Sequence, residues 1–246
     1  MKTDENSKEI NKRLQRLFSN IPLSVLSQLK FDSEAIFSVT NQYIAIDICK
    51  NLLKIKGITN ESKVTDATAC IGGNVFSFMK FFKKVDAIEI DPIKCEMLKH
   101  NISVLGENYI NIDNTRVNVI QGNCLDYILD TTYLKSRFPS EKGNIIPTQN
   151  KEKITQDILF IDPPWGGNSY KDTLNLNLYL QDSLGNEIEL FDIIKMLDSK
   201  TKVIVLKVPI NYNLSNIQKV TDTYKIESIK GYSRPNSMNI IILSLI

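Results

Sequence analysis

The segment 158–167, ILFIDPPWGG, joins an apolar run to residues that suit an amine-bearing substrate. Asp162 ends the run, so a strand would deliver its carboxylate to the edge of a sheet. Pro163 and Pro164 fix two φ angles and offer carbonyl oxygens without a competing N–H of their own. The exocyclic amine of a nucleobase has two N–H donors, and acceptors that hold it favour attack of its nitrogen on an electrophilic methyl group. Asp162 and Pro163 are therefore candidate catalytic residues for methyl transfer to an amine.

Trp165, the only tryptophan of the chain, follows these prolines. Its flat face could stack on a base, a contact that contributes about 1–3 kcal/mol, with added cation–π attraction for a positively charged base such as 7-methylguanine. Gly166 and Gly167 would allow a sharp turn around the substrate. The alternative is a buried tryptophan on a turn, but its place after an acid and two prolines favours a role in substrate binding. Trp165 is therefore counted with Asp162 and Pro163 among the candidate catalytic residues.

Two further strand ends carry acids. The segment 66–74, DATACIGGN, places an acid, small residues and Gly72 before a helix, which is typical of a tight turn that approaches a ligand. It does not match the GxGxxG pattern of nicotinamide-binding proteins, and a simple strand–helix turn is the alternative. After the next apolar run, Glu89 or Asp91 could accept the hydroxyls of a ribose, although Asp91 could instead cap a helix that begins at Pro92.

From residue 63 onward, short apolar runs alternate with segments of helical pattern, which predicts a mostly parallel sheet with helices on both faces. The last two runs are joined by only five residues, too few for a crossover, so we expect an antiparallel pair there. Seven strands are predicted, at 63–68, 85–91, 117–123, 158–164, 202–209, 224–232 and 238–246.

Residues 1–36 are predicted to form a helical arm, and residues 37–246 the main α/β domain. The arm carries an apolar stripe of helical spacing at Ile10, Leu14, Leu17, Phe18 and Ile21. The domain is expected to begin with a helix over 41–56, capped by Thr40 and stopped by Gly57. The polar segment 131–156 separates two strands by more than a usual connection and is interpreted as an insertion.

Composition limits the function classes. The 246 residues are 42% hydrophobic and 24% charged, as in ordinary globular proteins, and 30 Lys and Arg against 28 Asp and Glu give no strong basic field. A single histidine makes histidine-based triads and metal clusters improbable, so we expect no metal. No apolar run of membrane-spanning length occurs. We expect a soluble, intracellular monomer, in a compartment that the sequence leaves open.

Several motifs, taken in order, resemble the trimethylguanosine synthase family, the RNA cap guanine-N2 methyltransferases that use S-adenosylmethionine. The motifs that carry the resemblance are LFS at 17–19, FSVT at 37–40, DATACIGGN at 66–74, IEIDPIK at 88–94 and DPPWGGNSY at 162–170. An Asp-Pro-Pro-aromatic motif alone also occurs in amino-methyltransferases that act on adenine, but FSVT together with PPWGG is more specific.

The resemblance implies a Rossmann-like fold, S-adenosylmethionine as cofactor with S-adenosylhomocysteine as product, and a 7-methylguanosine-capped RNA or cap nucleotide as partner. By this resemblance and the arguments above, the cofactor would meet Thr40, Asp66, Ala67, Gly72, Asn74, Glu89, Asp91, Asn123 and Asp162. The cap would meet Phe18, Glu34, Ser38, Pro164, Trp165, Tyr170 and Lys207. For Phe18 the alternative is the apolar stripe, and for Glu34 a solvated charge.

Two departures from the family pattern stand out. At 122–124, GNC replaces an acid and an aromatic residue, so Asn123 would take the place of the acid beside the adenine. At 208–213, VPINYN has Ile210 where the family has an arginine expected to meet the cap phosphates. Lys207, or a basic residue of the arm such as Lys12 or Arg16, is the predicted substitute.

The sequence therefore predicts methyl transfer to N2 of 7-methylguanosine in an RNA cap. One alternative is a methyltransferase for an internal base amine, adenine N6 or guanine N2, of RNA or DNA. Such enzymes usually carry a basic groove, which this near-neutral chain does not suggest. A second alternative is a cap-binding protein without catalysis. Whether one or two methyl groups are transferred is left open.

Overall fold

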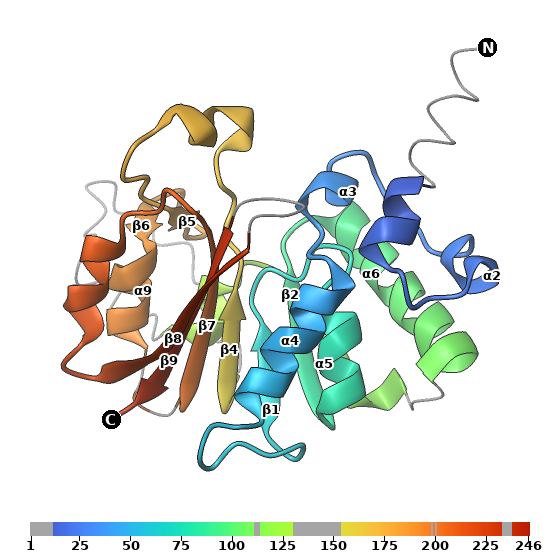
Figure 1. The fold of residues 1–246 in the computed structure, drawn as a ribbon, viewed down its shortest axis with the longest axis horizontal. Helices are drawn as coiled ribbons and strands as arrows, with labels where there is room; N and C mark the ends of the chain where they lie inside the picture. Colours follow the sequence, from blue (N-terminus) through green and yellow to red (C-terminus); the bar gives the residue numbers. More distant parts are fainter. Residues whose placement is uncertain (1–11, 111–113, 130–153, 198, 200, 233–237) are drawn as a thin grey trace. The chain divides into compact units, whose positions relative to one another are not determined.

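The computed structural model describes residues 12–110, 114–129, 154–197, 199, 201–232 and 238–246. By compactness the chain divides into unit 1, Met1–Gln121, and unit 2, Gly122–Ile246. The main sheet has seven strands in the hydrogen-bonded order β3-β2-β1-β4-β7-β9-β8 (Figure 1). The expected mostly parallel sheet with a C-terminal antiparallel pair is confirmed.

Unit 1 contributes the first three strands, which run parallel. They are β1 (Lys63–Asp66), β2 (Lys84–Glu89) and β3 (Val117–Gln121). The register places Asp66 beside Ala87, two residues before Glu89. Because the carboxyl ends of parallel strands meet at one edge, Asp66 and Glu89 come to the same edge of the sheet.

Unit 1 also contains the helices that surround these strand ends. Residues 12–17 are helical, followed by α2 (Leu23–Leu26), α3 (Ala35–Ser38), α4 (Gln42–Leu52), α5 (Val75–Phe81) and α6 (Pro92–Leu105). A short π-helical turn, Gly106–Ile110, and a 3₁₀ turn, Asn114–Arg116, lead to β3. The predicted apolar stripe is buried at Leu14, Leu17, Phe18 and Ile21, while Ile10 lies outside the described residues.

The expected helix over 41–56 is present but shorter. The cap is Asn41 rather than Thr40, because Asn41 has extended backbone angles and its side chain accepts the N–H of Tyr43 at 3.0 Å. The helix ends at Leu52, before Gly57, whose φ of +83° places it in the turn that follows. No helix within the described ranges is long and apolar enough to cross a membrane.

Unit 2 contributes the other four strands of the main sheet. They are β4 (Ile158–Ile161), β7 (Val203–Pro209), β8 (Tyr224–Tyr232) and β9 (Met238–Leu245). β4 and β7 run parallel and are buried along their whole length, as continuous apolar runs predict. β9 pairs antiparallel with both β7 and β8.

Several smaller elements of unit 2 lie between or beside these strands. They are α7 (Leu125–Ile128), η3 (Gly167–Asp172), the hairpin strands β5 (Tyr179–Gln181) and β6 (Glu187–Glu189), α9 (Leu190–Met196) and η4 (Leu214–Val220). The β5–β6 pair forms a separate two-stranded sheet that the sequence did not predict. The predicted insertion at 131–156 lies outside the described residues, apart from 154–156.

Asn101 of α6 anchors the N-terminal arm within unit 1. Its side chain is fully buried and makes three hydrogen bonds. The side-chain oxygen accepts the Lys30 N–H at 2.7 Å, and the side-chain nitrogen donates to the carbonyls of Lys30 at 2.9 Å and Ile71 at 3.2 Å. Asn101 thus fixes the arm to the loop that precedes Gly72.

Replacing Asn101 with leucine, which has a similar volume, should lower the free energy of unfolding by about 2 kcal/mol, because buried backbone groups lose their partners. Urea denaturation measures the change, and limited proteolysis should show earlier cleavage in the arm. Asn60→Leu, at an exposed position, is the matched control. Equal stability of the two variants would contradict the anchoring role.

Candidate active site

The register of β4 and β7 brings an acid and a lysine together in unit 2. Ile161 pairs with Leu206, so the next residues, Asp162 and Lys207, lie side by side. The Lys207 Nζ is 2.6 Å from Asp162 Oδ2, and the side chains are only 4% and 17% exposed. This is a nearly buried ion pair at the carboxyl end of a parallel strand.

The pair sets the protonation of Asp162. Burial raises the pKa of the Asp162 carboxyl, and the charge and hydrogen bond of Lys207 oppose that rise. The indole of Trp165 also favours the charged form, although its N–H has no well-aligned hydrogen bond to a described residue. Lys207 therefore keeps a desolvated carboxylate available as an acceptor.

Trp165 is held by the same lysine. The Lys207 Nζ lies over the indole ring, 5.5 Å from its centre, and the ring of Tyr170 meets the indole in a T-shaped contact at 5.2 Å. Trp165 is half-buried, Pro163 is buried and Pro164 is exposed. Gly166 has a φ of +86°, the left-handed conformation that the predicted sharp turn requires.

The structure corrects the expectation for Lys207. We expected this side chain to meet phosphates, but it is 3% exposed and its ammonium is committed to Asp162 and Trp165. A phosphate could reach it only by displacing the Asp162 carboxylate. Lys207 has these contacts because the register of β4 and β7 aligns it with Asp162.

In unit 1, Glu89 and Asp91 have different roles. Glu89 is 8% exposed, and its carboxylate accepts the N–H groups of Cys70 and Asp91, both at 2.8 Å. Burial raises the pKa of Glu89, and these N–H groups oppose the rise. Asp91 caps α6 by accepting from Ile93 at 2.7 Å and Lys94 at 3.0 Å, and these N–H groups lower its pKa. Of the two, Glu89 is better placed to accept ribose hydroxyls, since Asp91 serves as the predicted cap.

The loop after β1 is packed closely. Asp66 is fully buried and accepts the Thr68 N–H at 3.1 Å, and Ala67 is buried beside it. Gly72 has a φ of +103°, and a Cβ there would lie 2.5 Å from the Phe76 ring. Only glycine fits this position, so the loop is held against α5.

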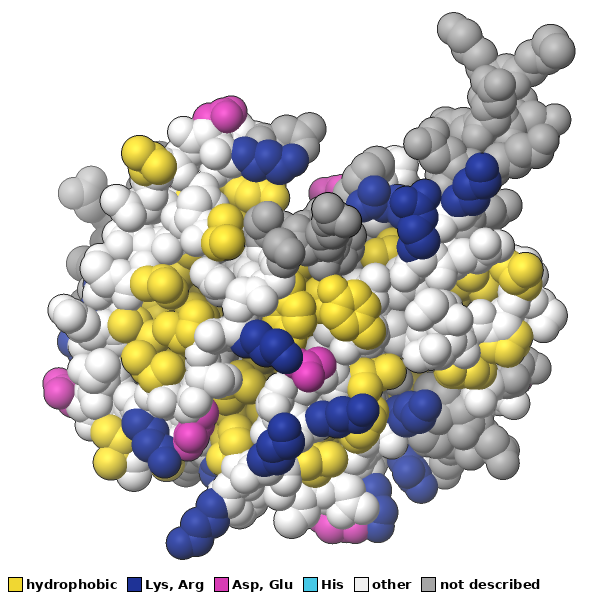
Figure 2. All heavy atoms as spheres, viewed as in Figure 1, with side chains coloured by type: hydrophobic (Ala, Val, Ile, Leu, Met, Phe, Trp, Pro, Cys, Tyr) yellow, Lys and Arg dark blue, Asp and Glu magenta, His cyan; other side chains and the backbone are white. Residues whose placement is uncertain are grey.

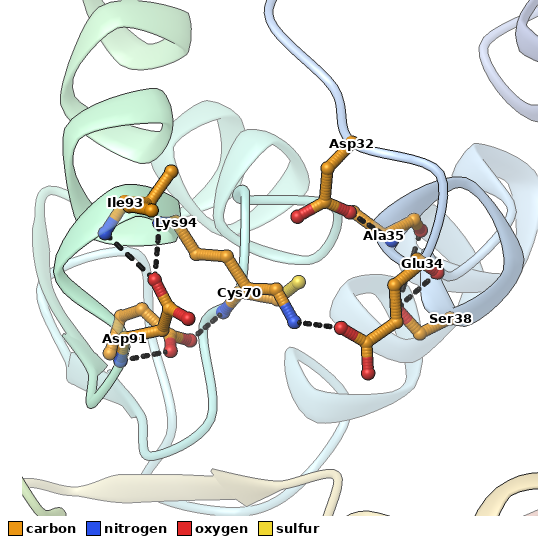
Figure 3. A network of polar contacts seen from close by, with 9 residues as sticks. Asp32, Glu34, Ala35, Ser38, Cys70, Asp91, Ile93 and Lys94 are labelled. Atoms are coloured by element: carbon orange, nitrogen blue, oxygen red, sulfur yellow. Dashed lines mark hydrogen bonds and ion pairs between the residues drawn. The ribbon is translucent and has the colours of Figure 1, made fainter.

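A polar network connects the arm to this loop (Figure 3). Glu34, whose side chain is 79% exposed, forms an ion pair with Lys94 at 2.7 Å. Ser38, at the end of α3, is exposed, and its hydroxyl lies 3.3 Å from the Ala35 carbonyl. Glu34 is therefore more than a solvated charge, because it ties the arm to α6 beside the Asp91 cap.

The buried side-chain oxygens of unit 1 that lack a hydrogen-bond partner among the described residues include two beside Gly73. They are the hydroxyl of Thr40, which is 1% exposed, and the side-chain oxygen of Asn74, which is 7% exposed. A Cβ on Gly73 would lie 3.0 Å from Val39 and 3.4 Å from the Thr40 N, so the arm and the loop approach closely here. Buried polar groups of this kind, which lack hydrogen-bond partners, could form hydrogen bonds with a bound polar ligand.

Two predicted site residues have structural contacts instead. Phe18 is 1% exposed and packs between Phe31 and Phe76, with ring centres 5.9 Å apart in each pair, which agrees with the apolar stripe. Asn123 donates to the Gln181 carbonyl at 2.7 Å and accepts the Leu125 N–H at 3.0 Å. Both polar atoms of its side chain are thus engaged within unit 2, and a direct role toward a ligand lacks support.

The sequence did not single out Lys94 or Asn101, and it misjudged the partner of Lys207. For Lys207 a signal did exist. Asp162 and Lys207 each end an apolar run, and neighbouring parallel strands would align them. For Asn101 no local pattern indicates contacts with Lys30 and Ile71, which lie far away in the sequence.

Lys207→Met should lower the free energy of unfolding by about 3 kcal/mol at pH 7, because it leaves a buried charge uncompensated. Without Lys207 the pKa of Asp162 rises further. A carboxyl group whose pKa is raised in the folded state loses stability as the pH rises through that pKa. The difference in free energy of unfolding between Lys207→Met and wild type should therefore shrink as the pH falls from 7 to 5. Chemical denaturation over this range measures it.

Lys202→Met is the matched control, because Lys202 pairs with Asp157 at 2.8 Å but is 55% exposed. Its loss should cost less than about 1 kcal/mol at every pH. The double variant Asp162→Asn/Lys207→Met should recover part of the lost stability. A pH-independent deficit in Lys207→Met would contradict the ion pair.

Comparison with known proteins finds the same fold in solved structures. Solved structures with the same fold include a putative methyltransferase from Porphyromonas gingivalis, with a TM-score of 0.58, 14% identity and coverage of 96% of this chain and 48% of that one. A putative RNA methyltransferase from Pyrococcus horikoshii has a TM-score of 0.51, 15% identity and coverage of 97% and 98%. The chain therefore shares its fold with these two proteins.

Sequence relatives are more specific. A trimethylguanosine synthase from Schizosaccharomyces pombe is 32% identical over 63% of this chain and 56% of its own length. An uncharacterised protein of Acanthamoeba polyphaga mimivirus is 29% identical over 69% of this chain and 52% of its own. The chain thus spans about half the length of these curated relatives. The profile of the RNA cap guanine-N2 methyltransferases matches residues 61–243, and the chain therefore belongs to this family.

Proposed function

We propose that this chain transfers a methyl group from S-adenosylmethionine to N2 of a 7-methylguanosine RNA cap. The observation that carries the proposal is the arrangement in unit 2, where a desolvated Asp162, paired with Lys207, is followed by two prolines and by Trp165. Family membership supports the same reaction. The substrate is the cap of an RNA or the cap nucleotide itself.

Unit 1 supplies residues that suit the cofactor. Glu89 would accept the ribose hydroxyls, and the buried oxygens of Thr40 and Asn74 would gain polar partners from the ligand. Asp66, Ala67 and Gly72 shape the loop between these groups. When bound, S-adenosylmethionine supplies an activated methyl group, so the chain itself needs no covalent nucleophile.

Unit 2 supplies the acceptors for the amine. The Asp162 carboxylate and the Pro163 carbonyl would accept the two N–H groups of the guanine N2, which fixes the direction of the nitrogen lone pair. Lys207 holds the carboxylate in place and opposes the rise of its pKa that burial causes. Asp162 would then receive the proton that the amine loses or stabilise the positive charge that develops on it.

Trp165 would select a cationic base. One face of its indole is covered by the Lys207 ammonium, so the 7-methylguanine would stack on the other face. A positively charged base gains cation–π attraction that guanine lacks. The site would therefore prefer a guanine that is already methylated at N7. Pro164, exposed beside Trp165, and Tyr170 would line the same site.

An internal-base methyltransferase is less well supported. On the face drawn in Figure 2, the Lys and Arg side chains form separate groups among uncharged and apolar ones, and the net charge is only +2. Long nucleic acids bound without a local feature such as a cap usually require a continuous basic surface. A catalytically inactive cap-binding protein would not need the desolvated Asp162 carboxylate.

Kinetics of two variants separate substrate binding from catalysis. Trp165→Ala should raise the KM for 7-methyl-GTP by about ten- to a hundredfold through lost stacking. Asp162→Asn, which keeps the shape beside Lys207, should lower kcat by about a hundredfold with little change in KM. Methylation assays with radiolabelled S-adenosylmethionine give both constants.

Tyr179→Ala and Glu187→Gln are matched controls, because both side chains are exposed in the β5–β6 hairpin of unit 2. Both should retain the wild-type constants. Wild-type turnover by Asp162→Asn would remove the carboxylate from the mechanism. An unchanged KM in Trp165→Ala would remove stacking from substrate recognition.

A further inference from the structure

An exposed lysine lies next to the aromatic pair of unit 2. Lys171 belongs to η3, and its Nζ is 5.8 Å from the centre of the Tyr170 ring. The Tyr170 ring is 5.2 Å from the Trp165 ring. By these two distances the Lys171 ammonium is close to the Trp165 ring. It can therefore reach the ribose and phosphates of a nucleotide whose base stacks on the indole.

The loop that carries Lys171 is held by side-chain hydrogen bonds. The side-chain nitrogen of Asn211 donates to the carbonyls of Tyr170 at 2.7 Å and Thr173 at 2.6 Å, on either side of Lys171. The Leu176 N–H also donates to the Asn211 carbonyl at 2.9 Å. These bonds tie the loop to the turn after β7, so the position of Lys171 relative to Trp165 is constrained.

Most other described lysines of unit 2 are engaged elsewhere. Those with a carboxylate partner are Lys202, Lys207, Lys219 and Lys225. Lys230 lies over the ring of Tyr232. Lys171 forms no ion pair with any residue that the structure describes, and its side chain is exposed. Its charge is therefore available to an anionic ligand.

We propose that Lys171 binds the phosphates of the nucleotide whose base stacks on Trp165. This inference rests on the proposed function and refines it, because recognition would then depend on the phosphate chain as well as on the base. A lysine ammonium suits a phosphate as a point charge. Ile210, 58% exposed on the adjoining turn, offers no charge, and the loop held by Asn211 supplies the cation instead.

Tryptophan fluorescence tests this directly, since Trp165 is the only tryptophan and a base stacked on it should quench its emission. Lys171→Met is titrated with 7-methylguanosine and with 7-methyl-GTP, which share the base and differ in the phosphates. Loss of one charge-assisted contact should weaken 7-methyl-GTP binding about five- to tenfold and leave 7-methylguanosine binding unchanged. Lys195→Met, an exposed lysine of α9, should match wild type for both ligands.

The outcomes separate the two proposals. Wild-type binding of both ligands by Lys171→Met, or equal weakening of both, would overturn the role of Lys171 while leaving cap binding intact. If neither ligand quenches the fluorescence of the wild-type protein, cap binding by Trp165 is overturned, and the inference for Lys171 falls with it. Selective loss of 7-methyl-GTP affinity would establish phosphate recognition by this residue.

Discussion

A carboxylate at the end of a fully buried strand requires a compensating partner, and in unit 2 this partner is Lys207. Without it, burial would favour the neutral form of Asp162, which loses one acceptor. Lys207 opposes this effect and fixes the direction of the carboxylate, and its ammonium also lies over the ring of Trp165. The strand register places this pair, and the two prolines and Trp165 follow Asp162 directly along the chain.

In unit 1, a buried carboxylate is stabilised mainly by backbone N–H groups. Glu89 is desolvated as well, and the N–H groups of Asp91 and Cys70, followed by the charge of Lys94, oppose the rise of its pKa. Those amides belong to the loop after β1 and to the residue that caps α6, so the carboxylate is fixed by the segments that carry the predicted cofactor-binding residues. A carboxylate fixed by amides retains acceptor capacity for neutral hydroxyls. A carboxylate beside an ammonium, as Asp162 is beside Lys207, is better suited to an amine that gains positive charge.

Much of this arrangement could be predicted from sequence, because it depends on local patterns. Apolar runs marked the seven strands of the main sheet, and acids at their ends marked the site. What escaped prediction depends on distances across strands or between distant segments. Lys207 was expected to meet phosphates because a single sequence does not show that its strand neighbours that of Asp162, although both residues end apolar runs. Asn41 and Thr40 are both good helix caps, and only the backbone angles decide between them. The β5–β6 hairpin is made of three-residue strands, too short for a periodic signal.

The central claim is methyl transfer to a base already methylated at N7. Mass spectrometry of 7-methyl-GTP and of GTP, each incubated with the protein and S-adenosylmethionine, tests it most directly. The account predicts a gain of one or two methyl masses on 7-methyl-GTP, placed on N2 by fragmentation, and none on GTP. Equal methylation of both nucleotides, or transfer to an atom other than N2, would contradict it.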